Sequence, residues 1–378
     1  MAGEAVMRLK IAIFIAKFAG QLSKTILHKS GETITGRVLL TLYPKAITEL
    51  AKGRTVICVS GTNGKTSTTK ALVEIISQLG SVTTSSSGSN LDRGAASALI
   101  SKSEYAVLEV DELHLANVIE QTKPKVVLLL NLTRDQLHRM HEVKRVAERW
   151  EKAVIAAPDT IFIGDIDDPF VSLALKAAVN KVAISFGGRK HLDGAVCPAC
   201  GAYLNWIGNN YECSCGLTNR KPDQLFASGS AAYRNAILAN ETGKLLGAKE
   251  IAIVEKRLER SFDRDYKGIS AVIRLTKNPA SWIEALNSIV GDKAILIVNS
   301  QEVDGIDTSW LWDISFAQLA SKQVIVCGER SLDIAYRLHV EGIEAEIADN
   351  FLSAIDKFEK GSRVYVLAAY TAFFELVN

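Results

Sequence analysis

A glycine-rich stretch at positions 61–68, Gly-Thr-Asn-Gly-Lys-Thr-Ser-Thr, combines the residue types that hold a nucleotide triphosphate. Gly61 and Gly64 permit backbone angles that bring amide groups close to an anion. Lys65 would reach the β- and γ-phosphates, and the Thr66 hydroxyl would hold Mg²⁺. The alternative is a tight turn capped by a helix. The predicted nucleotide contacts are Gly61, Thr62, Asn63, Gly64, Lys65, Thr66 and Ser67.

Acidic and polar side chains follow two apolar segments that read as buried strands. Glu109 ends the first segment, and Asp135 and His138 follow the second. Carboxylates at the carboxyl end of a strand, near a triphosphate, are well placed for Mg²⁺, which prefers oxygen ligands. We predict Glu109 as a magnesium ligand beside Thr66, with Asp135 and His138 as further candidates. For those two, a polar helix N-terminus is the alternative.

Four cysteines form two close pairs, Cys197 with Cys200 and Cys213 with Cys215. Two such pairs present the four thiolates that tetrahedral Zn²⁺ requires. We predict a structural zinc ribbon inserted at 194–222, and free buried thiols or disulfides are the alternative. All four ligands would come from the protein, so the zinc would have no open catalytic position.

Composition limits the class of protein. The chain has 378 residues, of which 48% are hydrophobic, and its net charge is +2. This near balance argues against a nucleic-acid partner. Leu9–Gly20 is apolar but is interrupted by Lys10 and Lys17, lacks a cleavage site and is too short to span a bilayer. We expect a cytoplasmic protein.

Two regions in which predicted strands and helices alternate must position these residues. Apolar strands alternate with helical segments after the loop, which predicts a parallel sheet with helices on both faces in a central domain at 51–250. A second alternation of predicted strands and helices indicates a Rossmann-like domain at 251–378. The charged stretch 255–267 is interpreted as a linker and hinge. The strand candidates are residues 55–59, 105–109, 126–130, 160–163, 182–184, 271–275, 294–298, 324–327, 344–347 and 364–368.

Residues 1–50 are expected to be helical. Apolar residues between Ile11 and Leu22 recur at helical spacing, while Lys10, Lys17 and Lys24 recur every seven residues on another face. Such a helix could pack on the domain behind it, or it could rest on an anionic membrane surface. Both interpretations remain open from the sequence.

Two tryptophan-containing stretches, Lys277–Trp282 and Asp304–Asp313, stand out in the second domain. The tryptophans could fill a core while the aspartates cap a helix. If exposed, the same cluster would make a partner-binding surface, because tryptophan is enriched at interface hot spots.

Together these motifs resemble the Mur ligase superfamily and, within it, the MurT family. The superfamily likeness rests on the 61–68 loop, on Glu109 and on Asn235 in a small-residue helix. The narrower likeness adds the segments 88–94, 108–112, 131–139, 277–282 and 304–313, the cysteine ribbon and the closing residues 370–372.

The resemblance implies ATP-dependent activation of the D-glutamate α-carboxylate of lipid II as an acyl phosphate, which ammonia then attacks. It implies ATP, Mg²⁺ and Zn²⁺ as cofactors, and Lys65 and Glu109 as catalytic groups. Cys58 and Cys327 lie in apolar strands and do not look like glutaminase nucleophiles. A GatD-like glutaminase partner is therefore implied, with Asp307, or else Asp313, orienting its histidine.

The family pattern is also altered in places. Ala232 replaces an asparagine before Asn235, and Asp263 stands where a glycine precedes Arg264, the implied ribose contact. Two other functions remain: a stand-alone amino-acid ligase like folylpolyglutamate synthase, and a zinc-ribbon nucleic-acid-binding or scaffold protein. A lipid-linked substrate would place the cytoplasmic enzyme at the inner membrane surface.

Overall fold

The structure is a computed structural model that describes residues 2–27, 31–85, 91–135, 142–252, 261–301 and 304–377. The chain divides into two compact units. The first contains residues 1–132 and 143–259, and the second contains residues 133–142 and 260–378. The short segment 133–142 thus leaves the first unit in the middle of its sequence and belongs to the second.

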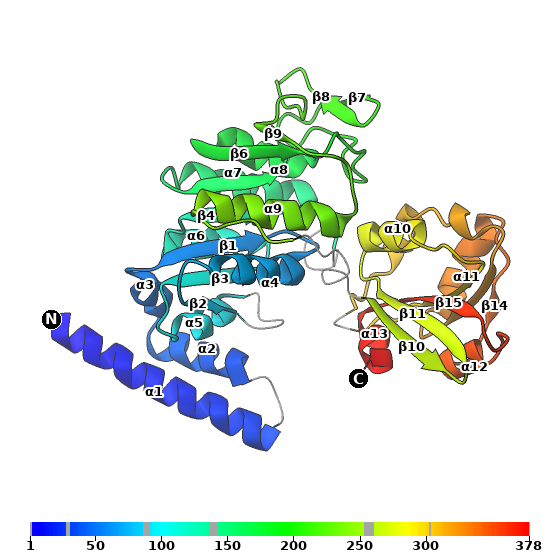
Figure 1. Ribbon diagram of the computed structural model, residues 1–378, viewed down its shortest axis with the longest axis horizontal. Helices are drawn as coiled ribbons and strands as arrows, with labels where there is room; N and C mark the ends of the chain where they lie inside the picture. The colour runs from blue at the N-terminus through cyan, green and yellow to red at the C-terminus, as the bar shows by residue number, and fades with distance from the viewer. Residues whose placement is uncertain are drawn as a thin grey trace. The chain divides into compact units, whose positions relative to one another are not determined.

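The first unit is built on a parallel seven-stranded sheet (Figure 1). Its order is β2 (Val82–Thr84), β3 (Tyr105–Val110), β1 (Thr55–Ser60), β4 (Val126–Leu129), β5 (Ile161–Asp165), β6 (Asn180–Ser185) and β9 (Gln224–Leu225). The five strands expected from the apolar runs are confirmed within one or two residues at each end. The short β2 and β9 have no apolar run and were not predicted.

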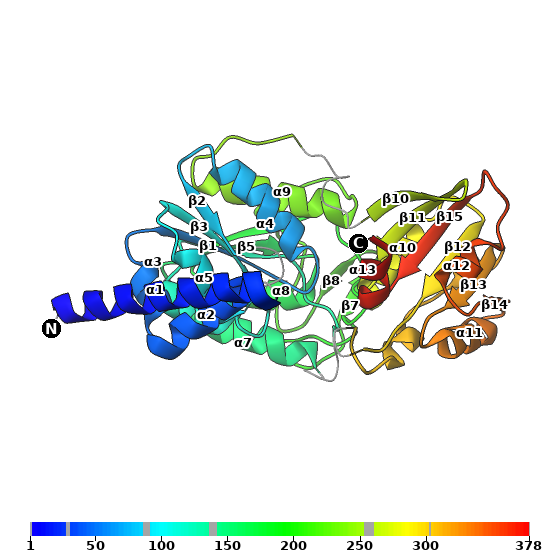
Figure 2. The ribbon, with the colours of Figure 1, turned by 90° about the horizontal axis from the view of Figure 1, so that it is seen from below.

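Helices cover both faces of this sheet, as the alternation predicts (Figure 2). On one face, α4 (Lys65–Ile76) and α9 (Ala231–Leu245) share a core with the strands. Leu72 and Leu238 of these helices lie in that core with Ile57 of β1 and Leu128 of β4, and all four are buried. The opposite face is covered by α5 (Asp92–Leu99), α6 (Leu115–Thr122), α7 (Val143–Ile155) and α8 (Pro169–Ala177).

The N-terminal residues form two packed helices, α1 (Ala2–Leu27) and α2 (Gly31–Leu42). Small residues make the contact close, because a Cβ added at Gly20 would lie 1.9 Å from Thr35 Oγ1. This face of α1 therefore packs on α2, and α2 in turn contacts α5. Among the described helices, none is both long enough and apolar enough to cross a bilayer.

A small antiparallel hairpin of β7 (Asn205–Ile207) and β8 (Asn210–Glu212) lies in the cysteine-containing insertion. Tyr211 of β8 is buried, and its hydroxyl donates a hydrogen bond of 2.8 Å to the Ile166 carbonyl after β5. The insertion is therefore fixed to the carboxyl end of the sheet by polar contacts.

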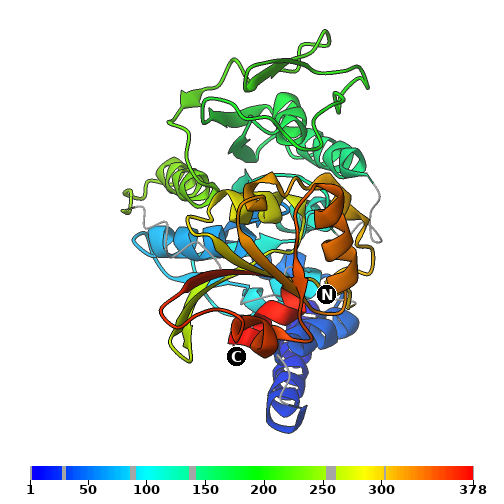
Figure 3. The ribbon, with the colours of Figure 1, turned by 90° about the vertical axis from the view of Figure 1, so that its right-hand side faces the viewer.

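The second unit has its own six-stranded sheet (Figure 3). Its order is β10 (Ser261–Tyr266), β11 (Ile269–Leu275), β15 (Arg363–Ala368), β12 (Lys293–Ile297), β13 (Gln323–Cys327) and β14 (Glu346–Ile347). The five predicted strands are present, and only the β10–β11 pair is antiparallel. The linker interpretation of 255–267 is wrong for Ser261–Tyr266, which form the edge strand β10; residues 253–260 lie outside the described part.

Helices pack on both sides of the second sheet. One core includes α10 (Pro279–Asn287), the 3₁₀ turn η2 (Ser309–Asp313) and α11 (Ser331–Val340). The other includes α12 (Phe351–Ile355) and the C-terminal α13 (Tyr370–Val377). This second unit is a separate α/β layer structure with two apolar cores.

Candidate functional site

The glycine-rich loop connects β1 to the N-terminus of α4. Gly61 has a φ of 145° and Gly64 a φ of 84°, both in the region that favours glycine. A Cβ added at Gly64 would lie 2.1 Å from Asn235 Nδ2, so the loop and α9 approach too closely for any side chain there. The predicted contact Asn235 is therefore held against the loop, where it is buried.

Asn131, just after β4, holds the loop in place. The Thr62 N–H donates to the Asn131 carbonyl at 2.8 Å, and the Asn63 N–H donates to Asn131 Oδ1 at 3.0 Å. Asn131 Nδ2 in turn donates to the Asn63 carbonyl at 2.9 Å. Three hydrogen bonds thus fix the backbone that would surround a phosphate. The sequence shows Asn131 as a strand-end polar residue but does not show that it binds the loop.

The ammonium of Lys65 lies over the loop. It donates to the carbonyl of Gly61 and pairs with Glu112 Oε2 at 3.0 Å. Glu112 is itself held, because the Trp150 indole donates to its carbonyl at 2.9 Å. Lys65 is 9% exposed, so its charge is held close to the loop and is poorly screened by water.

The two predicted magnesium ligands of the first unit lie side by side. Thr66 Oγ1 donates to Glu109 Oε1 at 3.1 Å. The backbone of Glu109 is fixed by a 3.0 Å hydrogen bond from its N–H to Ser85 Oγ. The hydroxyl, at the start of α4, and the carboxylate, on β3, are oxygen donors of the kind that Mg²⁺ takes together with phosphate and water. The residues present therefore fit this ion.

Two other predicted site residues, Asp135 and Arg264, belong to the second unit. The carboxylate of Asp135 pairs with Lys277 Nζ at 2.7 Å. Arg264, on β10 of the same unit, donates to the carbonyls of Leu376 and Val377 at the end of α13. His138 lies outside the described residues.

The two aspartates implied for a partner's active site flank Trp310 and Trp312 in the sequence of the second unit. Asp307 is exposed and accepts a 2.8 Å hydrogen bond from the Ser309 N–H, as in an Asx turn. Asp313 is partly buried and pairs with Arg134 at 2.7 Å. Both carboxylates are therefore positioned by specific contacts.

The tryptophan cluster is divided between core and surface. Trp282 and Trp310 are buried with ring centroids 6.1 Å apart, so the interpretation of these two as surface residues is wrong. Trp312 is 55% exposed and lies against Tyr336, itself exposed, at 6.2 Å. Spacing alone could not distinguish these tryptophans, because η2 turns one side chain inward and the other outward.

The four clustered cysteines come together as predicted. Their sulfur atoms all lie within 4.8 Å of one another, with Cys197 Sγ 3.7 Å from Cys215 Sγ and Cys200 Sγ 3.4 Å from Cys213 Sγ. Ligands about 2.3 Å from a tetrahedral Zn²⁺ would have sulfur atoms about 3.8 Å apart. A hydrogen bond from the Cys215 N–H is the main cause that lowers the pKa of Cys213 to about 7. The geometry fits a zinc ion.

A buried acidic cluster joins the cysteine insertion to the sheet. Asp167 accepts hydrogen bonds from Asn219 Nδ2 at 3.0 Å and from the Phe186 N–H at 2.8 Å. Neighbouring Asp168 accepts a 2.8 Å hydrogen bond from the Leu132 N–H and pairs with His191 Nε2 at 3.2 Å. Since Leu132 directly follows the asparagine that holds the phosphate loop, these contacts connect the insertion to that segment. The sequence reasoning missed this cluster.

The cluster perturbs the titration of its members. Burial opposes ionisation of Asp168, but the His191 charge and the hydrogen bonds from His191 and Leu132 outweigh it, so the pKa of Asp168 is lowered. Burial likewise opposes protonation of His191, but Asp168 outweighs it and raises the pKa of His191 above its usual value. Below the raised pKa of His191, the two side chains therefore form a buried ion pair.

The two cysteines outside the insertion are unreactive by position. Burial raises the pKa of Cys58 to about 12 and that of Cys327 to about 11. Both are buried in strands. The expectation that both cysteines are buried in apolar strands, and so do not look like exposed nucleophiles, is confirmed.

Comparisons with known proteins agree with the site. The family model of the Mur ligase middle domain matches residues 59–203, and that of the MurT ligase C-terminal domain matches residues 275–373. The MurT subunit of lipid II isoglutaminyl synthase from Streptococcus pneumoniae is 27% identical, with 98% of this chain and 96% of that protein covered. The corresponding Staphylococcus aureus subunit is also 27% identical, with 90% of each chain covered.

A solved structure supports the fold. The MurF ligase of Thermotoga maritima, in complex with ADP, matches with a TM-score of 0.59 and 19% identity, over 91% of this chain and 82% of that one. The first unit therefore has the Mur ligase type of α/β fold with a parallel sheet. The chain belongs to the Mur ligase superfamily and, within it, to the MurT family.

Proposed function

We propose that this protein is the synthase subunit that amidates the D-glutamate α-carboxylate of lipid II to D-isoglutamine, with ATP as the energy source. The observation that carries the proposal is the arrangement of Lys65, Thr66 and Glu109 around a loop fixed by Asn131. The relatives that cover almost the whole chain are MurT subunits of a glutamine-hydrolysing lipid II isoglutaminyl synthase, which supports this substrate.

The chemistry follows from the residues. A carboxylate is a poor electrophile, so its oxygen first attacks the γ-phosphorus of ATP, and ADP leaves. The loop amides and Lys65 stabilise the negative charge that moves during this transfer. Bound Mg²⁺, held by Thr66 and Glu109, would neutralise further charge on the phosphates. Ammonia then attacks the acyl carbon and loses a proton, phosphate leaves, and the amide remains.

Other residues are proposed to complete the nucleotide site. Asn235 contacts the loop, and Arg264 is retained as the candidate ribose contact. Asp135 and His138 are retained as candidate magnesium ligands. We keep the predicted domain division as part of the proposal: a helical segment at 1–50, the ATPase domain at 51–250 and a Rossmann-like domain at 251–378.

The cysteine insertion is proposed to be a structural zinc ribbon, with Cys197, Cys200, Cys213 and Cys215 as ligands. The sulfur separations support this assignment. A Cys₄ site leaves zinc no open position, so the ion would stabilise the insertion and not act on substrate.

The ammonia is proposed to come from a GatD-like glutaminase partner. The six cysteines of the chain are either buried in strands or clustered in the insertion, which supports an external nucleophile. The exposed Asp307 is the first choice for orienting the partner's histidine, and Asp313 is the second. Trp312, exposed nearby in the sequence, would contact the partner.

Asp307→Asn and Asp313→Asn test the partner role. The complex is assayed for lipid II amidation with glutamine and, separately, with ammonium chloride, which bypasses the glutaminase. If one of these aspartates orients the partner's histidine, its variant should lose glutamine-dependent turnover and keep ammonium-dependent turnover. Unchanged glutamine use in both variants would rule out these aspartates.

Two further measurements separate the proposed function from the two rival functions. Consumption of ATP with an amino acid in place of ammonia would indicate a stand-alone ligase like folylpolyglutamate synthase. Strong, salt-sensitive affinity for DNA or RNA would support a nucleic-acid-binding protein. The proposed substrate carries a lipid, so we propose that the enzyme works in the cytoplasm, at the inner face of the membrane.

A further inference from the structure

Helix α1 carries an apolar stripe that the protein does not cover. Met7, Ile11, Phe14, Phe18 and Leu22 follow one another at spacings of three or four residues, which places them on one helix face. All five are exposed, and the exposed fractions of Phe14 and Phe18 are 74% and 62%. Large aromatic side chains exposed in a row mark an interaction surface.

The stripe lies apart from the face that packs on the protein. Ala12, Ala16 and Gly20 face α2, and these small residues are buried. A helix that only needed to pack on α2 would leave polar residues on its other face. The packing contact therefore does not explain the phenylalanines.

Charge decides the kind of partner. Lys10, Lys17 and Lys24 are exposed and recur every seven residues along one side of the stripe. Arg8 is paired with Glu4 at 2.8 Å, and Glu4 is the only carboxylate of α1. A row of cations beside exposed aromatic and aliphatic side chains is typical of helices that lie in the surface of an anionic bilayer. Two copies of α1 would instead bring lysines together.

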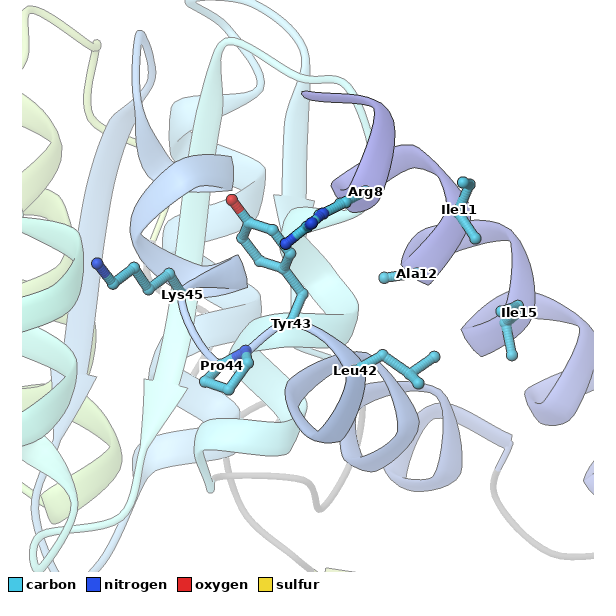
Figure 4. A pocket seen from close by; sticks show the side chains of 8 residues that line it. All are labelled: Arg8, Ile11, Ala12, Ile15, Leu42, Tyr43, Pro44 and Lys45. Carbon is cyan, nitrogen blue, oxygen red and sulfur yellow. The ribbon is translucent and has the colours of Figure 1, made fainter. Parts of the chain in front are cut away.

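A groove extends this apolar surface (Figure 4). It has a volume of about 520 Å³ and is lined by Ile11, Ala12 and Ile15 of α1 and by Leu42 and Pro44 at the end of α2 and just after it. Arg8, Tyr43 and Lys45 add polar groups to its lining. Such a groove can take part of a lipid chain while the cations contact the headgroups.

We propose that α1 lies in the surface of an anionic phospholipid bilayer, with Phe14 and Phe18 among the acyl chains and Lys10 and Lys17 at the phosphates. This inference goes beyond the proposed function and stands without it. It explains both the uncovered stripe and the cations beside it with one partner.

Flotation of the full-length protein with vesicles tests the proposal. We compare phosphatidylcholine alone with an equal mixture of phosphatidylcholine and phosphatidylglycerol, and expect binding mainly to the mixture. Phe14→Asp with Phe18→Asp should weaken binding more than about tenfold. Lys10→Gln with Lys17→Gln should weaken binding to the mixture about thirtyfold.

The control variant replaces two other apolar residues of the first unit that are about as exposed as Phe14 and Phe18. Val179→Asp with Leu225→Asp should bind vesicles as the parent does. ATP binding, measured in all variants, shows whether each variant is folded. If the phenylalanine variant does not fold, the lysine variant alone tests the proposal. Unchanged vesicle binding in the lysine variant, or equal binding of the parent to neutral and anionic vesicles, would overturn the proposal.

Discussion

The buried ion pair between Asp168 and His191 should stabilise the first unit and keep the cysteine insertion attached to it. Asp168→Asn removes the charge with little change in shape. The N–H groups of Leu132 and Phe170 donate to different oxygens of the Asp168 carboxylate, at 2.8 Å each, so the variant side chain can accept only one of these two hydrogen bonds. The perturbation therefore tests the charge and one hydrogen-bond acceptor, and leaves the volume unchanged.

The magnitude follows from burial. Asp168 is completely buried and the His191 side chain is 7% exposed, so water cannot replace the lost partner. Removing one member of a buried pair costs about 3–5 kcal/mol. For a unit of this size, that corresponds to a fall of about 10 °C in Tm.

The effect should depend on pH. The pKa of His191 is raised in the folded state, so the stability it adds is fully present below its unfolded pKa and is lost as pH rises through the folded pKa. The pKa of Asp168 is lowered, so its contribution is lost only as pH falls through the folded pKa, in acid. The variant should therefore lose more stability at about pH 6 than at about pH 9.

Thermal unfolding of the parent, Asp168→Asn and the exposed control Asp159→Asn provides the measurement. The control should unfold as the parent does at both pH values. The reasoning is refuted if Asp168→Asn has the parent's Tm, or if its deficit is the same at low and high pH.

Two further predictions concern the loop and the insertion. Gly64→Ala should weaken ATP binding at least about tenfold, because its φ of 84° and the contact with Asn235 both exclude a Cβ. ATP affinity is measured by calorimetry, with Gly53→Ala as the control. The φ of Gly53 is 72°, but no atom lies within 4 Å of the added Cβ. Equal losses of ATP affinity in the two variants would contradict this explanation. Removal of metal by a chelator should lower Tm, and metal affinity should fall as pH falls, because protons compete for the four cysteine thiolates. A Tm and zinc content unaffected by Cys213→Ser would contradict the ribbon.

Local signals made the loop and its strands predictable. Gly61, Gly64 and Lys65 act within a few residues of one another, so their spacing shows their role. The buried strands are continuous apolar runs, as expected in a sheet covered on both faces. Asn235 was found only through the family resemblance.

Contacts between distant segments were not predictable. Asp168 and His191 are far apart in sequence from Leu132, and no spacing rule links them. The charged strand Ser261–Tyr266 lacks an alternating pattern because it is a largely exposed edge strand, where charged residues prevent unwanted pairing. It therefore resembled a linker.

The most direct test of the central claim is the amidation of lipid II by the complex of this chain with its glutaminase, with ATP and glutamine present. Mass spectrometry follows the conversion of the carboxylate to the carboxamide in the parent, in Lys65→Ala and in Lys70→Ala, an exposed lysine on the same helix. We expect the parent and Lys70→Ala to form the amide, and Lys65→Ala to be slower by on the order of a hundredfold. Amide formation by Lys65→Ala at the parent's rate, or none by the parent, would contradict the account.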